Sequence, residues 1–295
     1  MRGNKILMTA LLIVFAASSG LGQDQQQKLA PQYRRPEIEI KAVPISGNLY
    51  ELKGGVSNSA FYVGEKGVFI FDTKMTPEEA KKIQSAIAGL TDKSITHIIL
   101  THSDGDHVGG LTGFPRGMTI IAHSGTARHM ETAFSKDEQK AYLPDTIFSD
   151  KMSIETGQAD IKLIYFGRAH TDGDAVAFFR DEKAVICGDL IFVGRDPLIH
   201  RHKNGSAKGL IQVLKKILNL DADTFLSGHA DPIGRPELKT IVHQLEEQAA
   251  KVEQLFSAGK NLEEIKQAMG IEESGGQQRW PSFAENLYLE LAEKR

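Results

Sequence analysis

Four short apolar runs of this sequence each end in histidine or aspartate close to glycine. The run ITHIIL is followed by THSDGDHVGG, residues 101–110, and three later runs end in GRAHTDGD, CGD and SGHAD. Short apolar runs bounded by glycine predict buried strands. Because strand ends at one edge of a layered sheet form a natural crevice for a ligand, we predict one site assembled from four separate strand ends.

Strand-like and helical segments alternate along the rest of the chain. The runs EIEIKAVPI, NLYELKG, SAFYVG and GVFIFDT predict an antiparallel meander, and Asp181-Glu182 predicts a hairpin turn between two later strands. Thr76 and Glu79 have the spacing of a capping box, which predicts a helix running to Gly89. Helical periodicity returns in SAKGLIQVLKKILNL and near the carboxyl terminus. This order of elements predicts an α/β layered domain over residues 37–295.

The composition favours a globular protein that acts on a small molecule. Of 295 residues, 41% are hydrophobic and 25% are charged, and the formal net charge is -3. Charges of both signs are interspersed, so we expect no basic face that would bind nucleic acid. We expect a small molecule as the substrate. The single cysteine, Cys187, excludes an internal disulfide and lies in the apolar run AVICGD, as expected of a buried small side chain. The amphipathic C-terminal helices offer a surface for a dimer.

The first 22 residues have the layout of a secretory signal peptide. Arg2 and Lys5 precede a short apolar run, and small residues follow it. The run is shorter than the roughly 20 residues that span a bilayer. We therefore expect cleavage of residues 1–22 and export to the periplasm or the medium, without a membrane span after processing. Residues 23–36 predict a polar lead-in without a packed core.

The strand ends supply the side chains that a divalent metal ion accepts. Neutral imidazoles and ionised carboxylates are ligands for zinc and similar ions. The candidate ligands are His102, Asp104, Asp106, His107, His170, Asp189 and His229. The remaining histidines have simpler interpretations. We expect structural roles for His97 and His243, and positions near the motif for His123 and His129. His200 and His202 are expected to face solvent, on a loop that could also cover the site.

These segments resemble the metallo-β-lactamase superfamily of metal-dependent hydrolases over nearly all of the mature length. The resemblance rests on GVFIFDT, THSDGDHVGG, GRAHTDGDAVAFF, CGDLIFVGR, SGHAD and PSFAENLYLELA. It implies a four-layer αββα sandwich with the site at one edge, where two sheets meet. It also implies two divalent metal ions, with zinc preferred and manganese or iron as alternatives. The segment GDLIFVGR is similar to exported hydrolases close to the glyoxalase II and lactonase type.

The resemblance also implies roles for the candidate residues. In the family's order, the first metal belongs to His102, Asp104 and His170, the second to Asp106, His107 and His229, and Asp189 bridges them. Asp106 is also the expected general base. Asp72, at the end of GVFIFDT, is expected to support the histidines from behind, although a strand-end turn would explain it equally well.

Asp104 departs from the family pattern, because a second histidine is usual at its position. An aspartate oxygen lies two bonds from Cβ, as does the nearer imidazole nitrogen, so we expect Asp104 to bind metal rather than to have lost metal contact. The carboxylate adds a negative charge. We therefore expect a less acidified metal-bound water and a greater preference for harder ions.

The sequence thus predicts an exported hydrolase that uses a metal-bound hydroxide to attack an ester, thioester, lactone or amide carbonyl. Two alternatives stay open: an iron-dependent oxidoreductase or dioxygenase, because flavodiiron proteins of the same superfamily carry a glutamate at this position, and a metal-depleted binding protein. Arg195, Lys203 and Lys208 are candidates for binding a substrate carboxylate, with solvated surface charge as the simpler interpretation of each.

Overall fold

The computed structural model describes residues 38–157, 159–271 and 280–293. The expected signal peptide, residues 1–22, and the polar lead-in, residues 23–36, lie outside the described residues. Within the described ranges, no helix has both the length and the apolar character that crossing a membrane requires.

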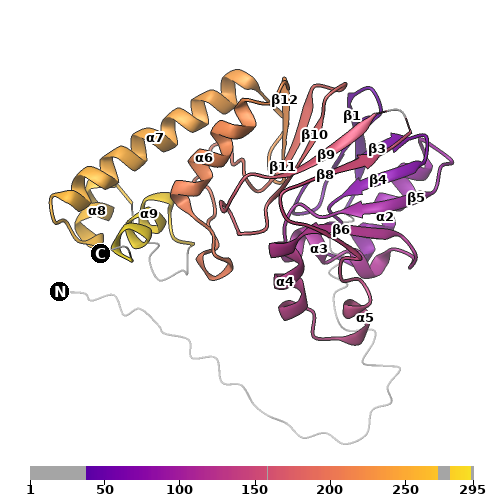
Figure 1. Cartoon of the computed structure of the whole chain (residues 1–295), viewed down its shortest axis with the longest axis horizontal. Coiled ribbons are helices and arrows are strands. Elements are labelled where there is room, and N and C mark those ends of the chain that lie inside the picture. Colours follow the sequence, from indigo (N-terminus) through magenta and orange to yellow (C-terminus); the bar gives the residue numbers. More distant parts are fainter. Residues whose placement is uncertain (1–37, 158, 272–279, 294–295) are drawn as a thin grey trace, which may run out of the picture. The chain divides into compact units, whose positions relative to one another are not determined.

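The first sheet has seven strands in chain order (Figure 1). Its strands are β1 (Lys41–Ser46), β2 (Leu49–Lys53), β3 (Ser59–Gly64), β4 (Gly67–Phe71), β5 (Ile95–Ile99), β6 (Thr119–His123) and β7 (Thr146–Phe148). Strands β1 to β4 pair antiparallel, as the meander prediction requires, and β4 to β7 pair parallel. The carboxyl ends of β4 and β5 therefore lie at the same edge of the sheet.

The second sheet has the order β13-β12-β11-β10-β9-β8. Its strands are β8 (Lys151–Glu155), β9 (Asp160–Tyr165), β10 (Ala175–Phe179), β11 (Ala184–Gly188), β12 (Thr224–Ser227) and β13 (Ile233–Gly234). The expected hairpin joins β10 to β11, where Phe179 pairs with Ala184 across the turn. Strand β12 pairs parallel to β11, so both end at one edge.

Helices cover the outer face of each sheet, and apolar side chains fill the three spaces between layers. The helices are α2 (Pro77–Ala88), α3 (Gly105–Val108), α4 (Ser124–Ala133), α5 (Asp137–Lys140), α6 (Ala207–Leu218), α7 (Arg235–Ser257), α8 (Leu262–Met269) and α9 (Phe283–Ala292), with 3-10 turns at Leu111–Gly113 and Arg201–Lys203. Phe69 and Phe179 belong to the core between the sheets, Ile83 to the core under α2, and Leu214 to the core under α6 and α7. The four-layer αββα sandwich is confirmed.

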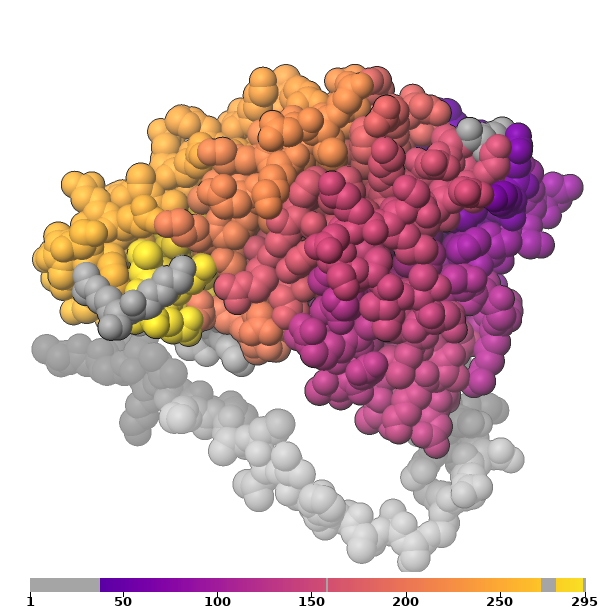
Figure 2. Space-filling model, in the orientation of Figure 1, coloured from indigo at the N-terminus to yellow at the C-terminus, as the bar shows by residue number. Residues whose placement is uncertain are grey.

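The two halves of this sandwich form one continuous body. In the space-filling view, pink and coral surface of the second half joins the indigo-to-magenta surface of the first half to the orange-to-yellow surface of the C-terminal helices without a break (Figure 2). The loops after β5, β9, β11 and β12 lie where the halves meet, and these loops carry the candidate ligands.

Candidate metal centre

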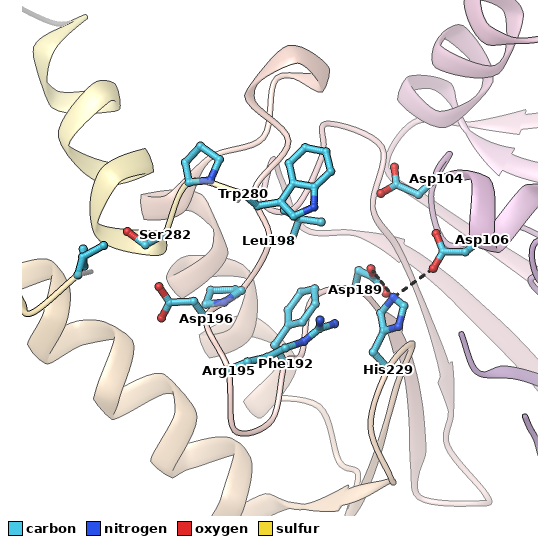
Figure 3. A pocket seen from close by; sticks show the side chains of 13 residues that line it. Asp104, Asp106, Asp189, Phe192, Arg195, Asp196, Leu198, His229, Trp280 and Ser282 are labelled. Carbon is cyan, nitrogen blue, oxygen red and sulfur yellow. Dashed lines mark hydrogen bonds and ion pairs between the residues drawn. The ribbon is translucent and has the colours of Figure 1, made fainter. Parts of the chain in front are cut away.

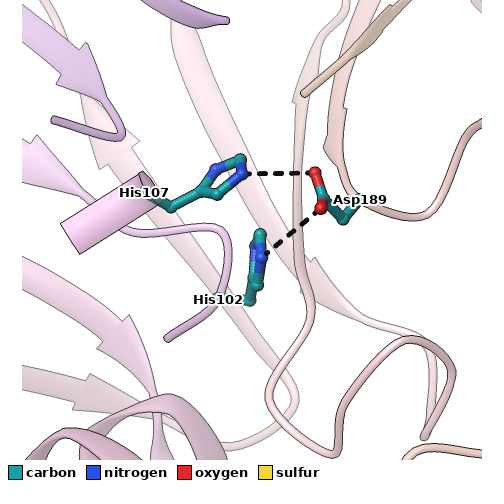
Figure 4. Close-up of side chains that lie close together, drawn as sticks. All are labelled: His102, His107 and Asp189. Carbon is teal, nitrogen blue, oxygen red and sulfur yellow. Dashed lines mark ion pairs between the residues drawn. The ribbon is translucent and has the colours of Figure 1, made fainter. Parts of the chain in front are cut away.

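His102, His107 and Asp189 face one another where the two sheets meet (Figure 4). His102 follows β5, His107 lies on α3, and Asp189 follows β11 of the other sheet. His107 Nε2 lies 3.2 Å from Asp189 Oδ1, and His102 Nε2 lies 3.9 Å from Asp189 Oδ2. All three side chains are buried. The group therefore joins the two halves of the sandwich through polar atoms in a buried setting.

Three polar atoms of this group lack any hydrogen-bond partner among the residues that the structure describes. They are His102 Nε2, His107 Nε2 and Asp189 Oδ1, all of them buried. Buried polar atoms nearly always have a partner, because leaving one unpaired costs about 1–3 kcal/mol. Two nitrogens and an oxygen directed at one another fit a bound cation that all three share.

The hydrogen bond made by Nδ1 of each candidate histidine shows which ring nitrogen carries the proton. His170 Nδ1 donates to the Leu198 carbonyl over 2.7 Å, and His229 Nδ1 donates to the Val56 carbonyl over 3.0 Å. A carbonyl oxygen only accepts, so each Nδ1 carries hydrogen and each Nε2 of the neutral ring keeps its lone pair. Both Nε2 atoms nevertheless face carboxylates, which favours a metal ion between them.

Asp72 fixes the orientation and the tautomer of the other two candidate histidines, His102 and His107. Its Oδ2 accepts a hydrogen bond from His107 Nδ1 over 2.8 Å and from the Thr101 hydroxyl over 2.6 Å. The Thr101 oxygen, having donated its proton, is free to accept from His102 Nδ1, 3.0 Å away. One buried carboxylate thus orients two imidazoles so that both Nε2 atoms point into the centre. This is the supporting position expected for Asp72.

The seven candidate ligands form three overlapping groups. Within each group the ligand atoms lie within 4.8 Å of one another: His102 with His107 and Asp189; His102 with Asp104 and His170; and Asp106 with His107 and His229. The second and third groups match the two ligand sets expected from the sequence. Their chemistry, imidazole nitrogens with carboxylate oxygens, fits divalent ions such as zinc.

Asp104 is surrounded by donors on both of its oxygens. Its Oδ1 accepts from Lys203 Nζ over 2.6 Å. Its Oδ2 lies 2.7 Å from His200 Nε2 and 3.1 Å from His170 Nε2. Lys203 also contacts the Ser103 hydroxyl. The negative charge that Asp104 adds to the site is therefore offset by a lysine from a distant loop.

His200 was expected to face solvent, and that expectation is wrong. Its residue is 6% exposed, whereas His202 on the same loop is exposed as expected. His200 Nδ1 is buried and has no hydrogen-bond partner within the described part of the chain, and Nε2 is directed at Asp104. Its protonated nitrogen is thus Nε2, the reverse of the candidate ligands, and His200 donates to Asp104. The segment LIHRHKNG does not follow an apolar strand-like run, so no local pattern signalled this contact.

The charges of the centre depend on one another. Burial opposes protonation of His170, but the hydrogen bond with Asp104 and nearby carboxylates raise its pKa to about 9. Hydrogen bonds with Asp106 and Asp189 likewise raise the pKa of His229 to about 9. Burial acts to raise the pKa of Asp189, but His107 and His229 hold it well below its usual value. The carboxylates stay ionised and demand positive charge, which protons or metal ions can supply.

The other histidines lie outside these groups. His123 Nδ1 accepts from the Gly125 backbone and caps α4, and His129 pairs with Asp172 over 2.7 Å. His97 stacks on Phe69 with ring centroids 4.7 Å apart. His243 is exposed on α7 beside Glu247. Each has a structural or surface explanation.

A cavity of about 450 Å³ opens onto the centre (Figure 3). Asp104, Asp106, Asp189 and His229 line it on one side. Of the three basic residues proposed from the sequence, Arg195 lines this cavity, and Lys203 contacts Asp104. Lys208 is not among the lining residues and pairs with Glu253 over 2.9 Å, so its placement gives no support to the suggested substrate contact.

Known proteins of several activities are similar to this chain. The alpha subunit of 2,4-dinitroanisole O-demethylase from Nocardioides sp. (strain JS1661) is 25% identical over 229 residues, 77% of this chain and 69% of that protein. A metallo-beta-lactamase type 2 from Elizabethkingia meningoseptica is 24% identical over 205 residues, 65% and 80% of the two chains. Hydroxyacylglutathione hydrolase from Methylococcus capsulatus is 28% identical over 131 residues, 43% and 45%.

Solved structures share the fold. A metallo-beta-lactamase from Pontibacter korlensis has a TM-score of 0.62 at 16% identity, covering 70% of this chain and 99% of that one. A double mutant of the sec-alkyl sulfatase PisA1 has a TM-score of 0.66 at 15% identity, covering 86% and 50%. The family model described as the metallo-beta-lactamase superfamily matches residues 52–229, more than half of the sequence. The chain belongs to the metallo-beta-lactamase superfamily.

Proposed function

We propose that this protein is a metal-dependent hydrolase that cleaves an ester, thioester, lactone or amide. One observation carries the proposal: four imidazole Nε2 lone pairs and three carboxylates converge beside an open cavity. The names of two relatives, a metallo-beta-lactamase and hydroxyacylglutathione hydrolase, support a hydrolytic reaction. The O-demethylase among the relatives shows that the superfamily is not restricted to one activity.

Two ligand sets would hold two divalent ions, zinc foremost. His102, Asp104 and His170 form one set, and Asp106, His107 and His229 form the other. Asp189 lies beside both, with its Oδ2 3.1 Å from His229 Nε2 and 3.9 Å from His102 Nε2. When bound, such ions supply Lewis-acid activation of water and of the scissile carbonyl.

Side chains of this protein position and deprotonate the nucleophilic water. Asp106 lines the cavity, and its Oδ2 lies 3.3 Å from His229 Nε2. A partly exposed carboxylate at this position accepts the proton of the attacking water and then passes it to the leaving group. Asp72 keeps His102 and His107 in the ligand tautomer throughout.

Metal analysis of protein purified without added metal tests the proposal, together with turnover of simple thioesters. The expected result is about two equivalents of zinc or manganese per chain with measurable thioester cleavage. Iron with a visible absorption band and no cleavage would favour the oxidoreductase alternative. Less than one equivalent with no turnover would favour a binding protein.

We further propose that the protein is exported. The charged and apolar layout of residues 1–22 supports this. The intact mass of protein recovered from the periplasm or medium of a bacterial host tests it. A mature chain that begins near Gln23 is expected, and a full-length chain confined to the cytoplasm would contradict export.

A further inference from the structure

Apolar side chains from two segments of the chain form a wall of the cavity beside the candidate ligands. Phe192 and Leu198 belong to the loop after β11, and Trp280 and Pro281 precede α9 (Figure 3). The Phe283 backbone N–H donates to Asp196 Oδ2 over 3.1 Å and joins these two segments. Distant parts of the chain thus build one wall.

Trp280 is 66% exposed although it lines this cavity. Large apolar side chains exposed in concave sites mark places where a ligand removes them from water. The Trp280 ring lies 5.3 Å from the His200 ring, nearly perpendicular to it at 82°. His200 in turn contacts Asp104. An occupant against Trp280 therefore lies next to the candidate metal centre.

The cavity lining is acidic at the candidate ligands and mixed, with both apolar and polar side chains, at the other end. Asp104, Asp106 and Asp189 line one end. The other end is lined by Leu198, Trp280 and Pro281, together with Arg195, Asp196 and Ser282. Phe192 lies between the two ends, with its ring stacked on that of His229 at 6.1 Å between centroids. The Arg195 guanidinium covers the Phe192 ring, with Cζ 4.7 Å from the ring centroid. A substrate that fits both ends presents a carbonyl to the carboxylate side and a bulky apolar group to the aromatic side.

We propose that the apolar wall of this cavity binds an aryl group, so that the protein prefers carbonyl substrates with an aromatic acyl group over short aliphatic ones. This inference rests on the proposed hydrolase function. An aryl ring suits the wall because it is rigid, buries a large apolar area and packs edge-to-face against tryptophan. The ring would take up the exposed face of Trp280 beside Leu198 and Pro281.

A binding experiment tests the site without relying on turnover. Trp280 is the only tryptophan of the chain, so its fluorescence reports on this wall alone. The metal-loaded protein is titrated with phenylacetate and with acetate, which share a carboxylate and differ in the ring. Calorimetry should give a Kd at least tenfold lower for phenylacetate, and phenylacetate should change the Trp280 emission. Equal affinities, or phenylacetate binding with unchanged emission, would overturn the inference.

Substitutions of Trp280 test whether the apolar wall causes the preference for phenylacetate over acetate. Trp280→Ala should remove most of the tenfold difference in Kd, and Trp280→Phe should keep it, because phenylalanine restores an aromatic face. Leu90→Ala is the matched control, since Leu90 is also an exposed hydrophobic residue, at 52%, and lies outside the cavity lining. An unchanged preference in Trp280→Ala would show that the ring binds elsewhere and would contradict the proposal.

Kinetics separate this inference from the proposed function. The S-ethyl thioesters of phenylacetic and acetic acid release the same thiol, so their kcat/KM ratio reports on the acyl group. We expect a ratio of at least tenfold in favour of the aryl substrate, falling in Trp280→Ala. Cleavage of both at equal efficiency overturns the aryl preference alone. If neither is cleaved, the proposed function fails, while the titrations still decide whether the wall binds the ring.

Discussion

Asp104 is the residue that most distinguishes this site, and its surroundings are built for a carboxylate. Lys203 and His200 donate to different oxygens of the same group, at 2.6 and 2.7 Å. Donors of this kind orient a metal-binding carboxylate and offset its charge. Both oxygens of Asp104 are therefore held by hydrogen-bond donors. A histidine at this position would instead face the ammonium group of a lysine and the N–H group of another imidazole.

Replacing Asp104 with asparagine should lower the metal content of the protein. The change keeps the shape but removes the anionic oxygen, so the set of His102, Asp104 and His170 loses its charged ligand. Metal analysis should show a fall from about two equivalents toward one. Asp221→Asn is the control, because Asp221 is exposed and pairs with Lys183 outside the ligand groups. Equal metal content in wild type and Asp104→Asn would show that Asp104 is not a ligand.

His200→Leu should weaken metal binding without removing any ligand. The variant deletes the donor that holds Asp104 Oδ2, and loss of such a supporting contact typically costs about 10–100-fold in metal affinity. Competition with a chromophoric chelator measures the affinity. In the comparison variant, His243→Leu, an exposed histidine is lost from α7 and no change is expected. Matching affinities for the two variants would leave His200 without a role in the centre.

The sequence indicated the candidate ligands and the supporting Asp72, but not the contacts that hold Asp104. His102, His170 and His229 could be found because each follows an apolar run and lies near glycine, which is a local signal. His200 and Lys203 reach Asp104 across nearly 100 residues of sequence from an irregular loop. No short-range pattern encodes such a contact, because it depends on where the packed helices and sheet place the loop.

At the scale of elements, helix α2 begins with the reciprocal capping box that the sequence indicated. The Thr76 hydroxyl accepts from the Glu79 N–H over 3.2 Å, and Glu79 Oε2 accepts from the Thr76 N–H over 3.0 Å. Thr76→Ala removes the first of these bonds and should lower the free energy of unfolding by about 1 kcal/mol. The expected fall in Tm is about 2–4 °C.

Thermal unfolding of the metal-loaded protein measures this effect. Thr132→Ala provides the comparison, because Thr132 lies within α4 and its hydroxyl donates to the Arg128 carbonyl of the same helix. A Tm for Thr76→Ala no lower than that of Thr132→Ala would mean that the cap contributes nothing. Metal content should not change in either variant, since neither threonine contacts a candidate ligand.

Helices and strands with a regular hydrophobic pattern or a capping residue could be predicted from the sequence. The pairing of distant strands was harder to predict. Helix α2 and the antiparallel strands β1 to β4 follow local signals. The segment between β6 and β7 forms two helices, α4 and α5, because the chain leaves helical geometry at Phe134, whose ψ is 91°. The parallel pairing of β11 with β12 spans a long crossover. Such pairing is set by packing over the whole domain, which short sequence windows do not record.

At the scale of the whole molecule, the centre joins the two sheets. His102, Asp104, Asp106 and His107 follow a strand of the first sheet, and His170, Asp189 and His229 follow strands of the second. Three carboxylates meet there, so without cations their mutual repulsion opposes the packing of one half on the other. Metal ions that bind both sets of loops favour the folded state by mass action.

Removing metal should therefore lower the stability of the entire fold and not only that of the loops. An ion present at 100 times its Kd stabilises the native state by about 2.7 kcal/mol. For a domain of this size that corresponds to a Tm difference of roughly 5–10 °C. Differential scanning calorimetry before and after chelation measures the difference, and restored zinc, but not magnesium, should recover it because the ligands include four imidazoles. The loss should be smaller in Asp104→Asn, which has less metal to lose. An unchanged Tm after complete chelation would show that the two sheets hold together without the centre.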